Sequence, residues 1–205
     1  MGVNYYIQKM IRKLFDRPCI KKSQLNRGAR IDIGSVCVQS VVGKYSYIGE
    51  HSSVLYAEIG NYSCISNYCA IGGGSHPISW VSMSPVFNTS KGIIKKKFGK
   101  LNYNPFEKVK IGNDVWIGSH CMIKSGIQIC DGAVIGMGSV VVKDVGPYEI
   151  WAGNPAKLIK RRFDDGTIQQ LIETNWWNAD EELLIHYSDL MNSPVDFLDI
   201  WGEKK

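Results

Sequence analysis

The chain has 205 residues, of which 44% are hydrophobic and 21% charged, and its net charge is +5. This is the composition of an ordinary soluble protein, and no apolar run approaches the ~20 residues that a membrane-spanning helix needs. The basic residues come without a zinc-finger spacing or an RNA-binding signature, which argues against a nucleic-acid-binding function.

Residues 1–30 are predicted to form an N-terminal helical cap. The stretch "NYYIQKMIRKLF" has a helical spacing of apolar residues interleaved with basic ones. A stack of coils needs its end covered, which favours a cap, and weak peripheral attachment to an anionic membrane surface is the alternative. The segment lacks the continuous apolar run and cleavage site of a signal peptide, so we expect a cytoplasmic location.

Residues 31–163 carry a repeat of six residues. An aliphatic residue recurs at every sixth position, often followed by Gly, and a small or β-branched residue stands four positions later. This period fits neither a helix nor a plain strand meander, but it fits a solenoid of short parallel strands joined by tight corners. The aliphatic positions, expected to point inward, are Val42, Ile48, Val54, Ile59, Ile65 and Ile71, then Ile111, Ile117, Ile123, Ile129, Ile135 and Val141.

The six cysteines are expected to be reduced thiols in a cytosolic chain. Cys37, Cys69 and Cys121 are each assigned to the small position of the repeat, where a small buried hydrophobe suffices. A nucleophilic Cys64 or Cys69 needs a base beside it, and no Ser-His-Asp or Cys-His set is visible. If the protein is an enzyme, a direct transfer between two bound substrates is therefore favoured over a route through a covalent enzyme intermediate.

The repeat stops at "IGGGSHPISW" and resumes at Ile111, which leaves a loop insert at about 77–108. Long loops in compact domains are usually functional. His76 ends the last regular hexad at the base of this loop, where a rigid coil holds it, and an imidazole is suited to proton removal near neutral pH. His76 is therefore the candidate general base. The other interpretation is a histidine that only caps the coil.

The remaining histidines are assigned to other roles. His51 and His120 share an outward corner position of the repeat, which indicates surface or interface residues, and His186 lies in the C-terminal part.

Residues 164–205 are predicted to form a C-terminal extension of two or three short helices. Asn178 with Glu181 resembles a capping box, and Ser193 before Pro194 is typical of a helix start. Trp176 and Trp177 are interpreted as core or interface anchors rather than as a platform for substrate.

Residues 31 to 185 together resemble a known family. The hexads resemble the hexapeptide-repeat acyltransferases, an all-β-dominated class built on a left-handed parallel β-helix, here with a long inserted loop and short helices at both termini. "VKIGNDVWIGSHCMIKSGIQICDGAVIGMGSVVVKDV" and "NWWNADEEL" are similar to the xenobiotic acetyltransferase branch. That branch contains chloramphenicol and streptogramin acetyltransferases and many sugar O-acetyltransferases.

The resemblance implies acetyl-CoA as co-substrate, a homotrimer, no metal, and a donor groove between two subunits. His76, in "GGGSHPISWVSMSPVF", takes the place of the family's catalytic histidine. Met137 and Val142 depart from the Ala and Thr common in sugar-acetylating members, which puts side-chain contacts there in doubt. The positions that match the family's donor site are Ser119, Gly138, Val142, Lys143, Lys157 and Lys160.

The implied reaction is O-acetylation of a sugar or surface-polysaccharide precursor, with Trp80 and Phe87 of the loop as acceptor contacts. An antibiotic O-acetyltransferase of the chloramphenicol or streptogramin type is the alternative. A trimeric β-helix zinc enzyme needs three converging histidines, and His51, His76 and His120 lack the expected spacing. A non-catalytic solenoid is disfavoured by the insert.

Overall fold

The computed structural model describes residues 7, 10–11, 14–90 and 93–201. The predicted N-terminal helix lies only partly within this range. Its described residues, Ile7, Met10, Ile11, Leu14 and Phe15, are helical and exposed. Within the described part of the chain, no helix has the length and apolar character needed to cross a membrane.

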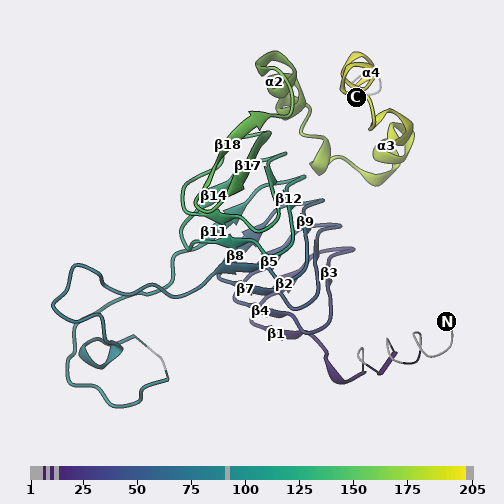
Figure 1. Ribbon diagram of the computed structural model, residues 1–205. Coiled ribbons are helices and arrows are strands. Elements are labelled where there is room, and N and C mark those ends of the chain that lie inside the picture. The colour runs from purple at the N-terminus through teal and green to yellow at the C-terminus, as the bar shows by residue number, and fades with distance from the viewer. Residues whose placement is uncertain (1–6, 8–9, 12–13, 91–92, 202–205) are drawn as a thin grey trace.

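The fold is a left-handed parallel β-helix with three sheets, one on each side of a triangular coil (Figure 1). Sheets A, B and C are parallel throughout, except that the last two strands of sheet C form an antiparallel hairpin. Sheet A contains β1 (Cys19–Lys21), β4 (Val36–Val38), β7 (Ser53–Leu55), β10 (Ala70–Gly72), β13 (Met122–Ile123) and β16 (Val140–Val141). Sheet B contains β2 (Gln24–Leu25), β5 (Val41–Val42), β8 (Ala57–Ile59), β11 (Val109–Ile111) and β14 (Gln128–Ile129). Sheet C contains β3 (Arg30–Ile31), β6 (Tyr47–Ile48), β9 (Cys64–Ile65), β12 (Trp116–Ile117), β15 (Val134–Ile135), β17 (Glu149–Gly153) and β18 (Ala156–Arg161).

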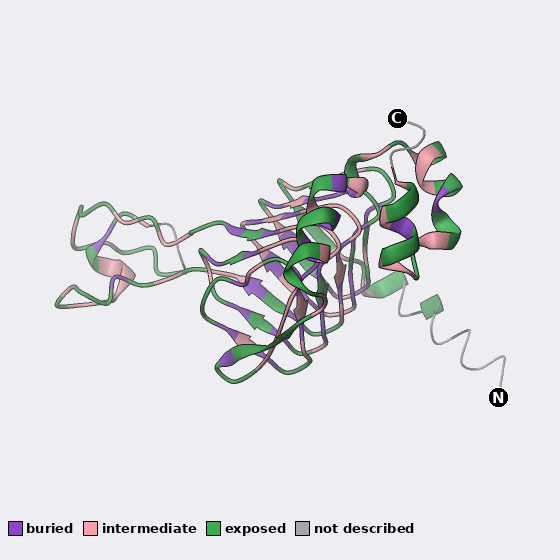
Figure 2. Cartoon of the chain, turned by 90° about the horizontal axis from the view of Figure 1, so that it is seen from above, coloured by how far each residue is buried: buried purple, intermediate pink, exposed green. Residues whose placement is uncertain are grey.

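The predicted aliphatic positions form the core. All twelve, from Val42 to Val141, are at most 4% exposed, and they alternate with outward residues along each strand (Figure 2). Cys69 and Cys121 occupy the small position as predicted. The assignment of Cys37 was wrong, because Cys37 pairs in register with Val54 and so takes an aliphatic position, while Ser35 takes the small one. The aliphatic position tolerates a cysteine because its sulfur is also a compact apolar group.

Buried serines connect one coil to the next. Ser46 Oγ donates to Gly60 O at 2.6 Å and accepts from Ser63 N at 2.8 Å. Ser63 Oγ repeats the pattern with Gly112 O at 2.8 Å and Val115 N at 3.1 Å. These hydroxyls satisfy backbone groups at the corners, so a polar residue inside the coil leaves no unpaired group there.

Corner residues take up the left-handed backbone conformation. Tyr62 has φ 58° and His120 has φ 60°. At the equivalent Gly132 (φ 68°), a Cβ atom would lie 2.6 Å from the ring of Tyr148, so only glycine fits. A single positive φ at each corner lets the chain turn within a hexad.

The first coil starts at β1, within the segment predicted to be a helical cap. Its inward positions are Ile20 and Leu25, which are 43% and 38% exposed. The end of a solenoid has no further coil to cover these residues, and they lack the following glycine that marks later hexads.

The insert departs after β10 and returns at β11, and it projects from the β-helix as a separate lobe (Figure 1). Among the described residues of the insert, one helical turn is present, η1 (Pro85–Phe87). Beyond the hairpin, the C-terminal extension comprises α2 (Asp165–Thr174), η2 (Trp176–Asn178), α3 (Glu181–His186), η3 (Ser188–Leu190) and α4 (Pro194–Ile200). Ser193 caps α4 as predicted, since its side chain accepts from Asp196 N. The capping box at Asn178 was wrong, because that residue ends η2 and α3 starts after Asp180.

Candidate active site

The two ends of the insert pair with each other at its neck. Ser75 N donates to Pro105 O at 2.7 Å, and the Ser75 hydroxyl lies 2.8 Å from the Tyr103 hydroxyl. The ring of Phe106 stacks on Tyr56 of the coil below, with centroids 4.1 Å apart. Phe106 thereby continues the corner column where the next coil is interrupted, and the neck is anchored to the β-helix.

His76 lies on this neck, directly after Ser75, with an exposed side chain. Its Nδ1 is 2.9 Å from the backbone oxygen of Met83. A carbonyl oxygen only accepts, so Nδ1 carries the proton and Nε2 of the neutral ring has a free lone pair. This is the tautomer that a general base needs.

A cavity of 350 Å³ opens beside His76. It lies between the neck and the lobe of the insert, and its wall combines apolar groups with hydroxyl and amide groups. The residues that line it are Gly74, Ser75, His76, Pro85, Asn88, Ser90, Ile93, Ile94, Tyr103, Pro105 and Phe106.

Trp80 and Phe87 do not line this cavity. Trp80 packs edge-on against Tyr103 at 5.8 Å, and Phe87 packs edge-on against Phe98 at 5.9 Å. Both rings pack against other aromatic residues of the insert. Tyr103, whose hydroxyl faces Ser75, lines the cavity instead. It was not among the predicted acceptor contacts, since "LNYNPF" has no periodicity to indicate which side chain turns inward.

Four of the predicted donor positions flank sheet A. Ser119 and Gly138 occupy the same corner in successive coils, and Gly138 N donates to Ser119 O at 2.8 Å. Gly138 leaves open space, since a Cβ atom there meets nothing within 4 Å. Val142 and Lys143 are exposed and follow β16, at the opposite edge of sheet A, which is also the edge where the chain leaves β10 for His76.

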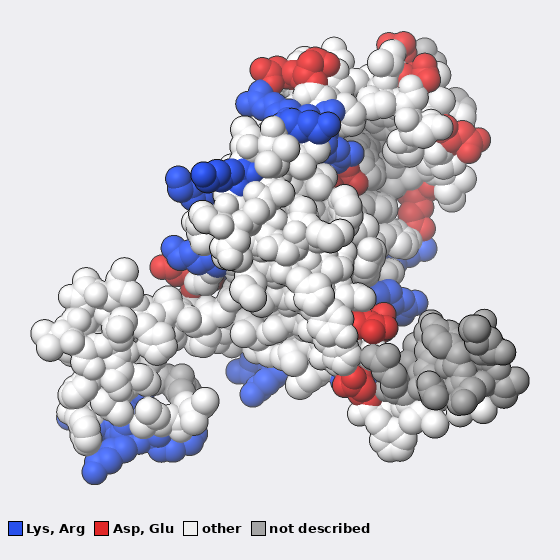
Figure 3. Space-filling view, viewed as in Figure 1, with Lys and Arg blue, Asp and Glu red and all other residues white. Residues whose placement is uncertain are grey.

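Lys157 and Lys160 lie on β18, in the hairpin that ends the coil stack, and both are exposed. Lys157 pairs in register with Ala152 and Lys160 with Ile150. These two lysines therefore lie at the C-terminal end of the stack, apart from the His76 neck, and Figure 3 shows basic side chains along this edge.

The other histidines do not approach His76. His51, Tyr68 and His120 stack in one column at a corner, with ring centroids 5.3 and 5.0 Å apart. His186 packs against Tyr187 in the C-terminal extension. Among the residues that the structure describes, no group of three or more His, Cys, Asp or Glu side chains is arranged to hold a metal ion.

Cys64 and Cys69 are poorly suited to act as nucleophiles. All six are free, and burial raises the pKa of the Cys64 and Cys69 thiols. A thiol that resists ionisation attacks a thioester weakly, so neither residue offers a covalent route.

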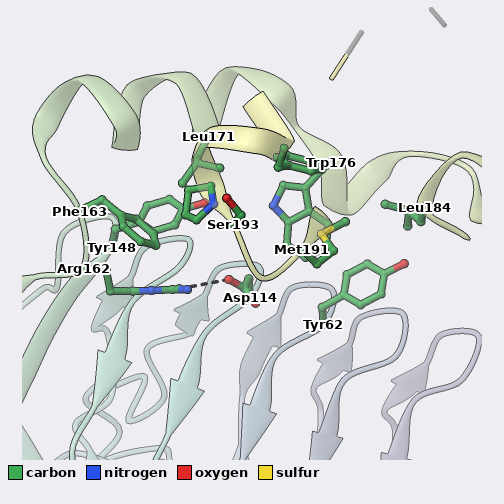
Figure 4. Close-up of a pocket in the computed structure, with 12 residues that line it drawn as sticks. Tyr62, Asp114, Tyr148, Arg162, Phe163, Leu171, Trp176, Leu184, Met191 and Ser193 are labelled. Atoms are coloured by element: carbon green, nitrogen blue, oxygen red, sulfur yellow. Dashed lines mark hydrogen bonds and ion pairs between the residues drawn. The ribbon is translucent and has the colours of Figure 1, made fainter. Parts of the chain in front are cut away.

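A second cavity, of 370 Å³, separates the C-terminal helices from the β-helix (Figure 4). Arg162 Nη1 lies 3.1 Å from Asp114 Oδ2 and donates to Gly132 O at 2.8 Å. Burial raises the pKa of the Asp114 carboxyl, and the Arg162 guanidinium opposes that rise. Burial raises the pKa of Tyr148 to about 12. No sequence signal connects Asp114 with Arg162, which are 48 positions apart.

The Trp176–Trp177 pair lies beside this second cavity. Trp177 is 4% exposed and Trp176 lines the cavity wall. Both residues pack between the extension and the corner at Tyr62, as expected for anchors.

The chain is similar in sequence to known acetyltransferases. A model of bacterial transferase hexapeptides (six repeats) matches residues 108–143. A chloramphenicol acetyltransferase of Agrobacterium fabrum is 37% identical over 186 residues, which cover 82% of this chain and 88% of that protein. A galactoside O-acetyltransferase of Escherichia coli is 50% identical over only 56 residues, 27% of this chain and 28% of that protein.

The solved structures show the same fold. An N-acyltransferase from Bacillus cereus, in complex with dTDP and 3-hydroxybutyryl-CoA, covers 91% of this chain and 97% of its own with a TM-score of 0.60 at 20% identity. A match with the Agrobacterium protein over most of both chains shows common descent. This chain is therefore an acetyltransferase and belongs to the hexapeptide-repeat acyltransferases, in the branch that includes chloramphenicol acetyltransferases.

Proposed function

We propose that the enzyme transfers an acetyl group from acetyl-CoA to a hydroxyl of an acceptor bound beside His76, with His76 as the general base. The observation that carries this proposal is the hydrogen bond from His76 Nδ1 to Met83 O, which leaves Nε2 able to accept a proton. Nε2 takes the proton of the acceptor hydroxyl as its oxygen attacks the thioester carbonyl. The tetrahedral intermediate then collapses, the C–S bond breaks, and the imidazolium returns the proton to the CoA thiolate.

The donor is proposed to lie along sheet A. The open space at Gly138 leaves room for the pantetheine arm, and Val142 leads from that sheet toward the His76 edge. Lys143, Lys157 and Lys160 are exposed and have the charge that phosphate requires.

A homotrimer is proposed from the outer faces of the three sheets. The outward residues of sheet A include Val36, Leu55 and Met122, whereas those of sheet B include Glu58 and Lys110. An apolar outer face is typical of a subunit interface, and cyclic closure is typical of soluble oligomers. A monomer mass by light scattering at micromolar concentration would count against the trimer.

The acceptor is proposed to be a sugar or surface-polysaccharide precursor. The cavity offers hydroxyl and amide groups from Ser75, Asn88, Ser90 and Tyr103 among its apolar walls, which suits an acceptor with several hydroxyls. We place the reaction in the cytoplasm, where six free thiols stay reduced.

An antibiotic of the chloramphenicol type is the second candidate acceptor. The specific observation in its favour is the similarity to the Agrobacterium chloramphenicol acetyltransferase over 88% of that protein, whereas the galactoside enzyme matches over 28%. On similarity alone this candidate fits at least as well as a sugar.

An acceptor panel decides between the two. Release of the CoA thiol from acetyl-CoA is followed with free sugars, sugar phosphates, nucleotide sugars, chloramphenicol and a streptogramin. Turnover confined to sugar-containing acceptors supports the first candidate, and turnover confined to the antibiotics supports the second. A protein that acetylates none of these, although it binds acetyl-CoA, would contradict the proposed reaction.

A further inference from the structure

The insert carries the net charge of the whole protein. Residues 77–106 contain five lysines and no Asp or Glu. The rest of the chain then has 19 basic and 19 acidic residues, because the totals are 24 and 19. A solvated surface without a charged ligand usually mixes both signs, so an all-positive lobe on a neutral body indicates an anionic ligand.

One of these lysines has a structural role. Lys97 Nζ donates to Pro85 O at 2.6 Å and to Ser90 O at 2.8 Å. Both carbonyls belong to residues that line the His76 cavity. Lys97 therefore holds its segment against the cavity wall, and its ammonium group is already engaged in these two hydrogen bonds.

The neighbouring lysines are available to a ligand. Lys95, Lys96 and Lys100 are exposed, and within the described ranges none of them forms an ion pair. Lys96 lies 5.5 Å above the ring of Phe98. By contrast, Lys108 at the base of the insert is already paired with Glu58. Figure 3 shows the blue side chains gathered on one side of the lobe.

The segment that carries the exposed lysines begins at the cavity wall. Ile93 and Ile94 line it, Lys95 follows directly in the chain, and Lys97 fixes this segment against Pro85 and Ser90. An acceptor that places its reacting hydroxyl near His76 in this cavity would extend toward the segment that carries the lysines.

We propose that Lys95, Lys96 and Lys100 bind a phosphate group of the acceptor, so that the substrate is a phosphorylated sugar rather than a neutral molecule. This inference rests on the proposed function and narrows its acceptor class. Lysine ammonium groups serve as point charges for phosphate, and exposed contacts of this kind are weakened by salt. Chloramphenicol is neutral and has no anionic group for these lysines to bind.

The test compares the same sugar in three forms: glucose, glucose 1-phosphate and UDP-glucose, each with saturating acetyl-CoA. We expect kcat/KM to be at least about 10-fold higher for a phosphorylated form than for glucose, since each exposed ion pair contributes up to a few-fold. Preference for glucose 1-phosphate identifies a sugar phosphate, and preference for UDP-glucose identifies a nucleotide-linked sugar. Equal kcat/KM for all three overturns the inference while leaving the acetyltransferase proposal intact.

A triple variant, Lys95→Gln, Lys96→Gln and Lys100→Gln, tests the named residues. It should raise KM for the phosphorylated acceptor about 10-fold, with kcat and the KM for acetyl-CoA little changed, and the effect should shrink at 0.5 M salt. A control triple, Lys22→Gln, Arg30→Gln and Lys44→Gln, removes the same formal charge from the first coils and should change nothing. If the KM for acetyl-CoA rises instead, the lysines bind the donor. If both triple variants raise the KM for the acceptor equally, the effect comes from the net charge of the protein and not from these three lysines. Either outcome overturns the proposal.

If no form of glucose is turned over, calorimetric titration of the protein with UDP-glucose and glucose 1-phosphate replaces the kinetic readout. Binding lost in the insert triple and kept in the control triple supports the inference. Binding that is absent, or equal in both variants, contradicts it.

Discussion

The coils and the insert follow opposite rules. In the coils, a residue such as Ile135 is fully buried because the coils above and below cover it. In the insert, Ile78 and Ile93 are 86% and 97% exposed, and the lobe is held by a paired neck and by Lys97. We infer a division of labour from this contrast: the rigid stack fixes the position of His76, and in the proposed function the irregular lobe supplies the cavity and the charge that select an acceptor.

The sharpest difference should appear in stability. Ile135→Ala removes a fully buried side chain between stacked coils, and we expect it to lower the free energy of unfolding by about 2–5 kcal/mol. Ile93→Ala is the matched substitution in the insert, where the side chain is 97% exposed, and should change it by less than about 0.5 kcal/mol. Chemical denaturation measures both. Equal losses in the two variants would mean that the lobe is part of the cooperative core.

A smaller loss is expected where the C-terminal extension meets the β-helix. Arg162→Ala removes the partner of Asp114 and leaves a partly buried carboxylate. The two side chains are 29% and 33% exposed, so we expect a loss of about 1–2 kcal/mol, below that of a fully buried pair. Arg161→Ala, which breaks the more exposed pair with Asp165, should cost less than about 0.5 kcal/mol.

The stability loss caused by Arg162→Ala should depend on pH, and the pKa of Asp114 sets the direction of that dependence. Burial raises the pKa of Asp114 and Arg162 lowers it, so the Arg162→Ala variant raises it further. An acid with a raised pKa in the folded state holds its proton more tightly there, so its contribution to stability falls as pH rises through the interval above the unfolded pKa. The deficit of Arg162→Ala should therefore be larger at pH 8 than at pH 5. A deficit that grows toward acid would contradict this assignment.

The smallest effects concern donor binding by the coils. Lys143→Ala and Lys157→Ala should each raise the KM for acetyl-CoA about 3- to 10-fold and lower kcat less, because a phosphate contact is made in the ground state and transition state alike. Lys110→Ala, an exposed lysine on sheet B, is the control. Initial-rate kinetics at low salt measure all three. If the sheet B control behaves like Lys143→Ala, the donor is not held along sheet A.

The repeat made the β-helix predictable, and the lack of a repeat limited everything else. Six-residue periodicity identified twelve inward positions correctly, because burial in a coil depends on register alone. Cys37 was misassigned because the first coil contains an Ile-Gly pair, Ile33-Gly34, that lies out of register with the aliphatic position at Ile31, and Cys37 stands four positions after Ile33. For the insert, the sequence predicted only where it begins and ends and that His76 is the candidate base. The tertiary contacts of the insert, such as the place of Tyr103 in the cavity wall and the packing of Trp80 on Tyr103 and of Phe87 on Phe98, follow from no local spacing. The Asp114–Arg162 pair joins distant segments and was equally invisible.

The turnover of two histidine variants tests the central claim most directly. His76→Ala removes the proposed base from the neck of the insert, whereas His120→Ala removes a corner histidine that stacks on Tyr68 in the coils. With an acceptor that the wild-type protein acetylates, we expect kcat of His76→Ala to fall about 10²- to 10⁴-fold, with acetyl-CoA affinity unchanged. His120→Ala should retain most of its activity. A His76→Ala protein that keeps its turnover, while His120→Ala loses it, would contradict the account and move the active site to the corner of the coils.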